Sequence, residues 1–306
     1  MNLSQLEYII AVDKHRHFAK AAKACFVTQP TLSMMIQKLE DELDVKIFDR
    51  SKKPVIPTEA GVKVIEQASK TLVESRKIGE IVASYKNVIE GNLRLGIIPT
   101  LAPYLLPLFI QSFLKNYPLI HLKIAEYTTE NIIDKLEKGE IDVGILVTPL
   151  NHKYIEEQPL FYETFMIYSS HEYDKKYLLP EDLNLNDLWL LEEGHCFRSQ
   201  ILNLCELRKK ADLQLEYAAG SIETLRQLVE NQQGATILPE LSTRYLTPEN
   251  RKKLMPFQPP APAREVSIVS HRDFVKKRFV TALVKEILAA LPTEILDRKE
   301  FERIDI

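Results

Sequence analysis

The sequence lacks any long hydrophobic run. None of its apolar stretches approaches the ~20 residues that a helix needs to cross a bilayer. The N-terminal stretch also lacks the basic, apolar and small-residue order of a signal peptide. These two absences argue against a membrane partner and a secreted protein, and they predict a cytoplasmic location.

Cysteine is scarce, with three residues in a chain of 306. So few cysteines exclude a fold that disulfides hold together. In a reducing cytosol, any disulfide between them would be transient, catalytic or sensory. We expect neither a metal nor a cofactor.

A strong excess of one charge is also missing, since the formal net charge is only -3. This balance argues against a uniformly basic nucleic-acid binder. Residues 1–58 nevertheless hold nine Lys and Arg against seven Asp and Glu, so the remainder of the chain is more acidic. The asymmetry is mild and decides nothing alone.

The first sixty residues show the pattern of a winged helix-turn-helix. Two short helical stretches end in VTQPTLSMMIQKLEDEL, where Thr28 is a suitable N-cap and Pro30 fits the first turn. A strand, a basic turn and a second strand follow in KIFDRSKKPVIPT, as in a wing. The expected DNA-binding residues are Gln29, Pro30, Thr31, Ser33, Lys38, Arg50, Lys52 and Lys53. A three-helix packing module with a solvated polar face is the competing interpretation.

Residues 59–90 predict one long helix without proline, with Thr58 as its N-cap. Apolar residues recur at Ile65, Ala68 and Leu72, and again from Ile78 to Ile89. A sixty-residue domain offers such a helix few partners. It therefore favours a linker that dimerises as a coiled helix, with a core helix of the next domain as the alternative.

The stretch from His17 to Ser51 resembles the winged helix of the LysR-type transcriptional regulators. The matching residues are Phe18, Ala21, Ala22, Gln29, Pro30, Leu39, Glu40, Leu43, Phe48 and Arg50. One departure is Asp44, where the family usually has glycine, although aspartate tolerates a left-handed cap. The resemblance implies a transcriptional regulator that binds double-stranded DNA, with RNA polymerase as a candidate further partner.

Beyond residue 90, apolar strands alternate with helices, which predicts a parallel α/β sheet covered on both faces. The pattern repeats after residue 163 and suggests two lobes with a cleft between them. The LysR resemblance implies the same arrangement, an effector domain like a periplasmic binding protein. The expected domains are 1–58, 59–90 and 91–306, with lobe I at 91–162 plus 266–306 and lobe II at 163–265. The expected strands include 188–193 and 215–220.

The stretch GHCFRSQILNLC contains two cysteines, Cys196 and Cys205, and predicts a helix that begins near Cys196. Nine helical residues rise roughly 13.5 Å and turn through about 900°, so Cys196 and Cys205 would point to opposite faces. A disulfide needs Cα atoms roughly 4.4–6.8 Å apart. A bond between the two cysteines would therefore require this helix to come apart. Small buried cysteines without chemistry are the alternative.

The position of Cys196 suits an activated thiolate. The positive end of a helix lowers a thiol pKa, and His195 is adjacent. Thr100 and Thr129 each follow a predicted strand and could donate hydrogen bonds to a peroxide oxygen. The third cysteine, Cys25, lies among alanines, and we expect it to serve only in hydrophobic packing.

At this spacing, the cysteine pair resembles that of the LysR-type regulators that sense hydrogen peroxide. The resemblance implies that peroxide oxidises Cys196 and that Cys205 resolves the sulfenic acid, with Thr100, Thr129 and His195 around the peroxide. It also implies an arginine after the last strand, where Arg272, or alternatively His271, is expected. A homotetramer built as a dimer of dimers is implied, with cytosolic thiol reductants reversing the disulfide.

Two other functions compete with this one. A LysR-type regulator could sense a small metabolite in the cleft, with structural cysteines. A thiol peroxidase or Cys-His hydrolase could use Cys196 and His195, but the helix-turn-helix argues against an enzyme, as does the lack of a third orienting residue.

Overall fold

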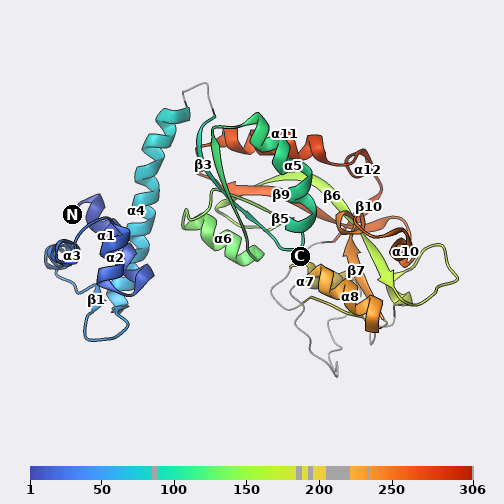
Figure 1. The fold of residues 1–306 in the computed structure, drawn as a ribbon, viewed down its shortest axis with the longest axis horizontal. Coiled ribbons are helices and arrows are strands. Elements are labelled where there is room, and N and C mark those ends of the chain that lie inside the picture. The colour runs from blue at the N-terminus through green and yellow to red at the C-terminus, as the bar shows by residue number, and fades with distance from the viewer. Residues whose placement is uncertain (85–88, 184–187, 192–195, 205–220, 233, 305–306) are drawn as a thin grey trace. The chain divides into compact units, whose positions relative to one another are not determined.

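The computed structural model describes residues 1–84, 89–183, 188–191, 196–204, 221–232 and 234–304. The chain divides into two compact units, Met1–Lys86 and Asn87–Ile306 (Figure 1). Within the described residues, no helix is both long enough and apolar enough to span a membrane.

The first unit is a winged helix-turn-helix followed by a long helix. Its elements are α1 (Leu3–His15), α2 (Phe18–Ala24), α3 (Gln29–Leu43), β1 (Phe48–Asp49), β2 (Ile56–Pro57) and α4 (Glu59–Ser84). Strands β1 and β2 pair antiparallel and form the expected wing. The inner face of α3 is completely buried at Leu32, Ile36 and Leu39. The unit therefore has its own hydrophobic core.

Local chemistry sets both ends of α3 as the sequence predicts. The Thr28 side chain accepts a hydrogen bond from the Thr31 amide, and Pro30 occupies the first turn. Asp44 caps the other end with a φ of 50°, the left-handed conformation that glycine usually supplies. Replacement of that glycine by aspartate thus leaves the cap intact.

Helix α4 begins in close contact with the wing. Thr58 Oγ1 accepts from the Gly61 amide at 2.9 Å and donates to the Lys46 carbonyl at 2.6 Å. A Cβ atom at Gly61 would overlap the carbonyl oxygen of Ile47, so glycine is required there. Further along, Ile65, Ala68 and Leu72 pack into the core of the first unit, whereas Ile78, Ile81 and Val82 are exposed in the single chain.

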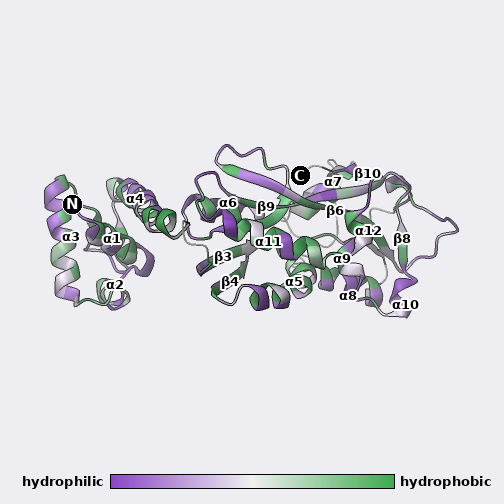
Figure 2. Cartoon of the chain, turned by 90° about the horizontal axis from the view of Figure 1, so that it is seen from above, coloured by the Kyte–Doolittle hydropathy of each residue, from purple (hydrophilic) through white to green (hydrophobic). Residues whose placement is uncertain are grey.

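The second unit combines a large sheet with helices on both faces. Its strands are β3 (Gly91–Ile97), β4 (Ile120–Glu126), β5 (Val143–Thr148), β6 (Ile155–Ser169), β7 (Ala235–Pro239), β8 (Leu254–Pro256), β9 (Ala261–His271) and β10 (Phe301–Arg303). Its helices are α5 (Ala102–Asn116), α6 (Thr129–Glu137), η1 (Pro180–Asp182, a 3-10 helix), α7 (Cys196–Leu204), α8 (Ile222–Gln232), α9 (Glu240–Thr243), α10 (Pro248–Arg251), α11 (Lys277–Ala290) and α12 (Thr293–Leu296). Helices α5 and α11 lie side by side (Figures 1 and 2).

The sheet is mixed, which corrects the expectation of a parallel one. The strands run in the order β4-β3-β5-β9-β6-β7, with β10 added to β9 and β8 added to β6. Strands β4, β3 and β5 are parallel, but β9 runs antiparallel to both β5 and β6. The long β6 and β9 pair from Ile155↔His271 to Thr164↔Ala263, and β6 continues to pair with β7 and β8. The continuous β6 therefore joins the two ends of the unit.

One expected strand is much reduced. At 188–193 the described residues make isolated bridges, Leu188 with Ala235 among them, and the Trp189 amide donates to the Ala235 carbonyl. Thr236 Oγ1 also donates to the Trp189 carbonyl at 2.9 Å. The strand expected at 215–220 lies outside the described residues.

Candidate functional site

The helix expected to begin near Cys196 is present. Helix α7 begins at Cys196 and ends at Leu204, as the sequence predicts. The Cys196 side chain, His195 and Cys205 lie outside the described residues.

Two expected hydroxyl residues follow the carboxyl ends of neighbouring parallel strands. Thr100 follows β3, and Thr129 opens α6 after β4, while the Tyr127 amide donates to the Ile97 carbonyl between these ends. Thr100 is 3% exposed. The Thr129 Oγ1 atom is buried and has no hydrogen-bond partner among the described residues. Both hydroxyls thus lie at the edge of the sheet where ligands of α/β proteins bind.

Thr100 is held by a fully buried arginine. Arg264 Nη1 donates to Thr100 Oγ1 at 3.0 Å, and Nη2 donates to the Thr100 carbonyl at 3.3 Å. Neither Arg264 nor its ion-pair partner Glu163 is exposed, and Arg264 Nε donates to Glu163 Oε2 at 2.8 Å. A hydroxyl has one hydrogen to donate. Thr100 accepts from Arg264, and among the described residues no acceptor takes its hydrogen, so it can donate to a small polar molecule.

The carboxylate of Glu163 completes a closed network. Its Oε1 accepts from the Leu241 amide at 2.8 Å, which ties β6 to α9. Burial raises the pKa of the Glu163 carboxyl, and the Arg264 guanidinium opposes that rise. A charged pair in this setting persists because its donors and acceptors are satisfied.

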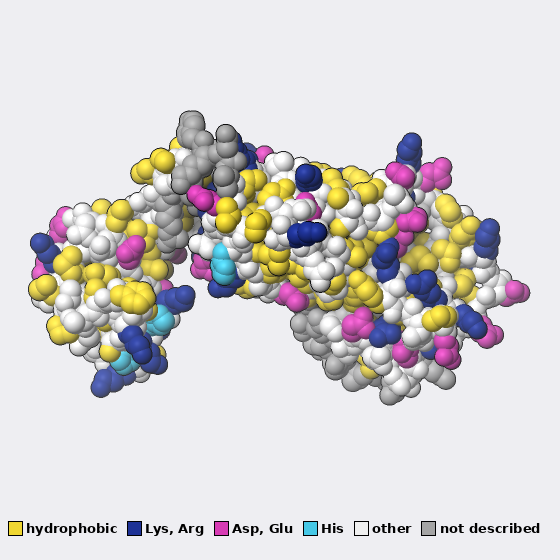
Figure 3. Space-filling view, turned by 45° about the horizontal axis from the view of Figure 1, so that its top comes forward, with side chains coloured by type: hydrophobic (Ala, Val, Ile, Leu, Met, Phe, Trp, Pro, Cys, Tyr) yellow, Lys and Arg dark blue, Asp and Glu magenta, His cyan; other side chains and the backbone are white. Residues whose placement is uncertain are grey.

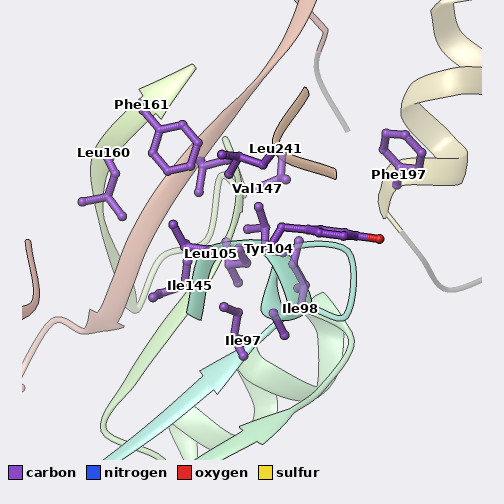
Figure 4. Packing of buried hydrophobic residues seen from close by; sticks show 14 of the residues in the cluster. Ile97, Ile98, Tyr104, Leu105, Ile145, Val147, Leu160, Phe161, Phe197 and Leu241 are labelled. Atoms are coloured by element: carbon purple, nitrogen blue, oxygen red, sulfur yellow. The ribbon is translucent and has the colours of Figure 1, made fainter. Parts of the chain in front are cut away.

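Helix α7 packs directly on this arginine. The Arg264 guanidinium lies 5.4 Å from the centre of the Phe197 ring, and Phe197 meets Phe165 edge to face at 5.4 Å. Figure 4 shows Phe197 on α7 at the side of the core towards which Tyr104 extends. The residue that follows Cys196 is therefore fixed against the side chain that holds Thr100.

The structure does not bring Arg272 or His271 to Thr100. Arg264 lies near the start of β9, whereas Arg272 follows its end, roughly 26 Å further along an extended strand. Arg272 instead lines a surface pocket with His152 and Glu156. The ring of His271 stacks on Tyr154 at 6.3 Å. The arginine expected beyond the end of β9 does not reach Thr100, and the arginine that contacts Thr100 lies within β9.

Most of the predicted DNA-binding residues are accessible. The exposed ones are Gln29, Pro30, Thr31, Lys38, Arg50, Lys52 and Lys53, whereas Ser33 is partly buried. On the face that Figure 3 shows, Lys, Arg and His side chains gather at one end of the first unit. This distribution fits a surface that contacts phosphates.

Arg50 has a structural role that the sequence did not suggest. Its Nη2 donates to Glu40 Oε2 and its Nη1 to Ser33 Oγ, both at 3.2 Å. The guanidinium also lies 5.0 Å from the centre of the Phe18 ring. Arg50 therefore joins the wing to α3 while its side chain stays 38% exposed.

Sequence reasoning missed Arg264, Glu163 and Gln200. Arg264 and Glu265 are adjacent charges within a mostly apolar strand, and this was the available signal for a buried ion pair. Gln200 has no exposed surface and donates to the Ile304 carbonyl at 2.8 Å. No sequence pattern indicated that contact. Within the described part of the chain, no cluster of His, Cys, Asp or Glu could hold a metal ion.

Known families match both units of the chain. The model of a bacterial regulatory helix-turn-helix protein of the lysR family matches residues 3–62. The model of the LysR substrate binding domain matches residues 86–292.

Among curated proteins, a hydrogen peroxide-inducible genes activator of Pectobacterium carotovorum subsp. carotovorum is 36% identical over 272 residues, covering 88% of this chain and 90% of the relative. The DNA-binding transcriptional dual regulator OxyR of Escherichia coli K12 is 36% identical over 275 residues, covering 88% and 89%.

Solved structures extend the similarity. A full-length OxyR variant from Pseudomonas aeruginosa matches with a TM-score of 0.77 and 34% identity, covering 95% of this chain and 99% of that one. A peroxide-bound OxyR mutant from Corynebacterium glutamicum matches with a TM-score of 0.61 and 28% identity, covering 94% and 92%. These matches confirm the resemblance inferred from the helix-turn-helix motif: the chain belongs to the LysR family of bacterial helix-turn-helix transcriptional regulators.

Proposed function

We propose that this regulator senses hydrogen peroxide through Cys196 and Cys205 and changes its DNA binding in response. One observation carries the proposal: α7 starts at Cys196, and its next residue packs on Arg264, which positions the Thr100 hydroxyl. Similarity to peroxide-inducible gene activators supports the choice of ligand.

The proposed chemistry has two steps. The Cys196 thiolate attacks one peroxide oxygen, an S–O bond forms, the O–O bond breaks, and the second oxygen leaves with a proton as water. The Cys205 thiol then attacks the sulfenic sulfur, an S–S bond forms, and a second water leaves. Thr100, Thr129 and His195 would surround the peroxide. Arg264 replaces Arg272 as the proposed cation, because it contacts Thr100.

The disulfide would act by unwinding α7. An intact helix of this length keeps its first residue far from the residue that follows its last, so bonding requires α7 to come apart. Cytosolic thiol reductants would restore both thiols. The cytoplasm is the expected location, because DNA and those reductants are present there. We assign no catalytic turnover to the protein.

For the DNA contact we propose the exposed residues of α3 and the wing, with operator DNA as partner and RNA polymerase as a candidate further one. For assembly, we propose that α4 forms a dimer and that two dimers form the tetramer. The supporting observation is the exposed apolar face of Ile78, Ile81 and Val82, which are 67%, 46% and 64% exposed. An Ile78→Glu variant should sediment as smaller species than the unmodified chain, and an unchanged oligomer would reject this face.

A thiol titration after brief exposure to micromolar peroxide tests the proposed function. We expect the loss of two thiols per chain, and the same loss in a Cys25→Ser variant. Cys196→Ser should keep DNA binding in the reduced state but lose the peroxide response. Retention of all three thiols would favour a LysR-type regulator of a small metabolite instead, and sustained peroxide consumption with a thiol reductant would favour a peroxidase.

A further inference from the structure

The C-terminal residues 293–304 connect three parts of the second unit. Arg298 Nη2 donates to Glu240 Oε1 of α9 at 2.8 Å. Phe301 stacks on Tyr162 of β6 with ring centres 4.2 Å apart. Strand β10 then pairs in parallel with the first residues of β9. These residues also lie beyond residue 292, where the match to the substrate-binding domain model ends.

The same segment reaches α7. Just after β10, the Ile304 amide donates to the Ala263 carbonyl at 2.8 Å. The Ile304 carbonyl in turn accepts from Gln200 Nε2 at 2.8 Å. Gln200 lies one helical turn after Cys196, has no exposed surface, and its Oε1 has no partner among the described residues. Ile304 thus anchors a buried side chain in the middle of α7 to strand β9.

We propose that residues 293–304 form a C-terminal clasp that stabilises the helical state of α7 and thereby sets the peroxide level at which the disulfide forms. This inference rests on the proposed function for its link to peroxide. A contact made in only one of two states shifts the equilibrium towards that state. The hydrogen bond from Gln200 requires α7 to be folded, so the clasp opposes the unwinding that the disulfide requires.

The clasp holds α7 through ordinary packing and hydrogen bonding. Loss of one buried hydrogen bond changes an equilibrium by about three- to tenfold. Phe301 and the Ile304 amide fix the segment, whereas Glu302 between them is exposed and serves as a matched control position. Phe301→Ala and Ile304→Pro should loosen the clasp, while Glu302→Ala should not.

Hydrogen–deuterium exchange of the reduced, full-length variants tests the clasp without any oxidation. We expect the amides of α7 to exchange about three- to tenfold faster in Phe301→Ala and Ile304→Pro than in the unmodified chain and in Glu302→Ala. Equal exchange in all four proteins would overturn the clasp. Circular dichroism and binding of the reduced protein to DNA identify a variant that has failed to fold. Of the two loosening variants, Phe301→Ala should disturb folding less than Ile304→Pro.

Equilibration in glutathione redox buffers tests the link to peroxide sensing. At a fixed ratio of reduced to oxidised glutathione, the ratio of disulfide to dithiol should rise about three- to tenfold in Phe301→Ala and Ile304→Pro. Faster exchange of α7 with an unchanged disulfide equilibrium would overturn the claim that the clasp sets the threshold. If the unmodified chain forms no disulfide, the proposed function fails, whereas the exchange rates still decide whether the clasp holds α7.

Discussion

Each of the two units contains an arginine that is paired with a buried glutamate, and the two pairs differ in their contact with water. In the first unit, Arg50 is 38% exposed above Glu40, which is 1% exposed. In the second unit, Arg264 and Glu163 are both fully buried. An exposed guanidinium can support a fold and still reach a phosphate, whereas a buried one can act only on small molecules and neighbouring side chains. The same pair of residues therefore suits DNA binding in one unit and a small-molecule site in the other.

The largest expected effect comes from breaking the buried pair. Arg264→Met leaves the Glu163 carboxylate buried without its cation and should lower the free energy of unfolding of the second unit by about 3–5 kcal/mol. Urea unfolding measures this loss. Replacing Glu163 with Leu in the same protein should recover most of it, because an apolar pair avoids the cost of a buried charge. A double variant no more stable than Arg264→Met would contradict this account.

Breaking the exposed Arg50–Glu40 pair should lower stability less than breaking the buried Arg264–Glu163 pair, but it should weaken DNA binding. Glu40 keeps the amides of Ile47 and Phe48 as donors, so Arg50→Ala should cost about 1 kcal/mol of folding free energy. Binding should weaken on all DNA sequences alike, and the slope of its salt dependence should fall by about one.

Filter-binding measurements at several salt concentrations test this effect of Arg50. Lys52→Ala is the matched control, because Lys52 is exposed on the same wing and should change the salt slope without changing stability. An altered preference at a single base would show that Arg50 reads sequence, and the wing assignment would need revision.

The smallest expected effect concerns Cys25. Burial and the nearby Glu7 carboxylate raise the pKa of the Cys25 thiol, so the thiol stays protonated at neutral pH. In a Cys196→Ser, Cys205→Ser double variant, alkylation of Cys25 should be slow at pH 7. Its rate should rise with pH and level off only above the ordinary thiol pKa of about 8.5. A plateau below that pH would mean that Cys25 is an activated thiol.

Sequence reasoning located features that depend on neighbouring residues. Thr28, Pro30 and Asp44 set the ends of α3 through contacts within a few positions, and each was predicted. The start of α7 at Cys196 was also predicted. The family was also recognised from a short motif, because the residues of a helix-turn-helix are close in the chain.

The features that were missed depend on contacts between distant residues. Arg264 and Thr100 are 164 positions apart, and the contact exists only because β9 runs antiparallel beside β5. The family resemblance implied an arginine after the last strand, which led to Arg272, whereas the arginine that contacts Thr100 is Arg264 within β9. Likewise, nothing near Gln200 in the sequence indicates that Ile304 lies against it.

The close approach of Gly61 to the backbone of Ile47 has a mechanical consequence. The Gly61 backbone lies against the Ile47 carbonyl, and the Thr58 hydroxyl links the Gly61 amide to the Lys46 carbonyl, so the start of α4 is held tightly against the residues that precede β1. We therefore expect a twist applied along α4 to pass to these residues through backbone contact rather than through side-chain rotamers. A methyl group at position 61 would overlap the Ile47 carbonyl oxygen and force these two segments apart.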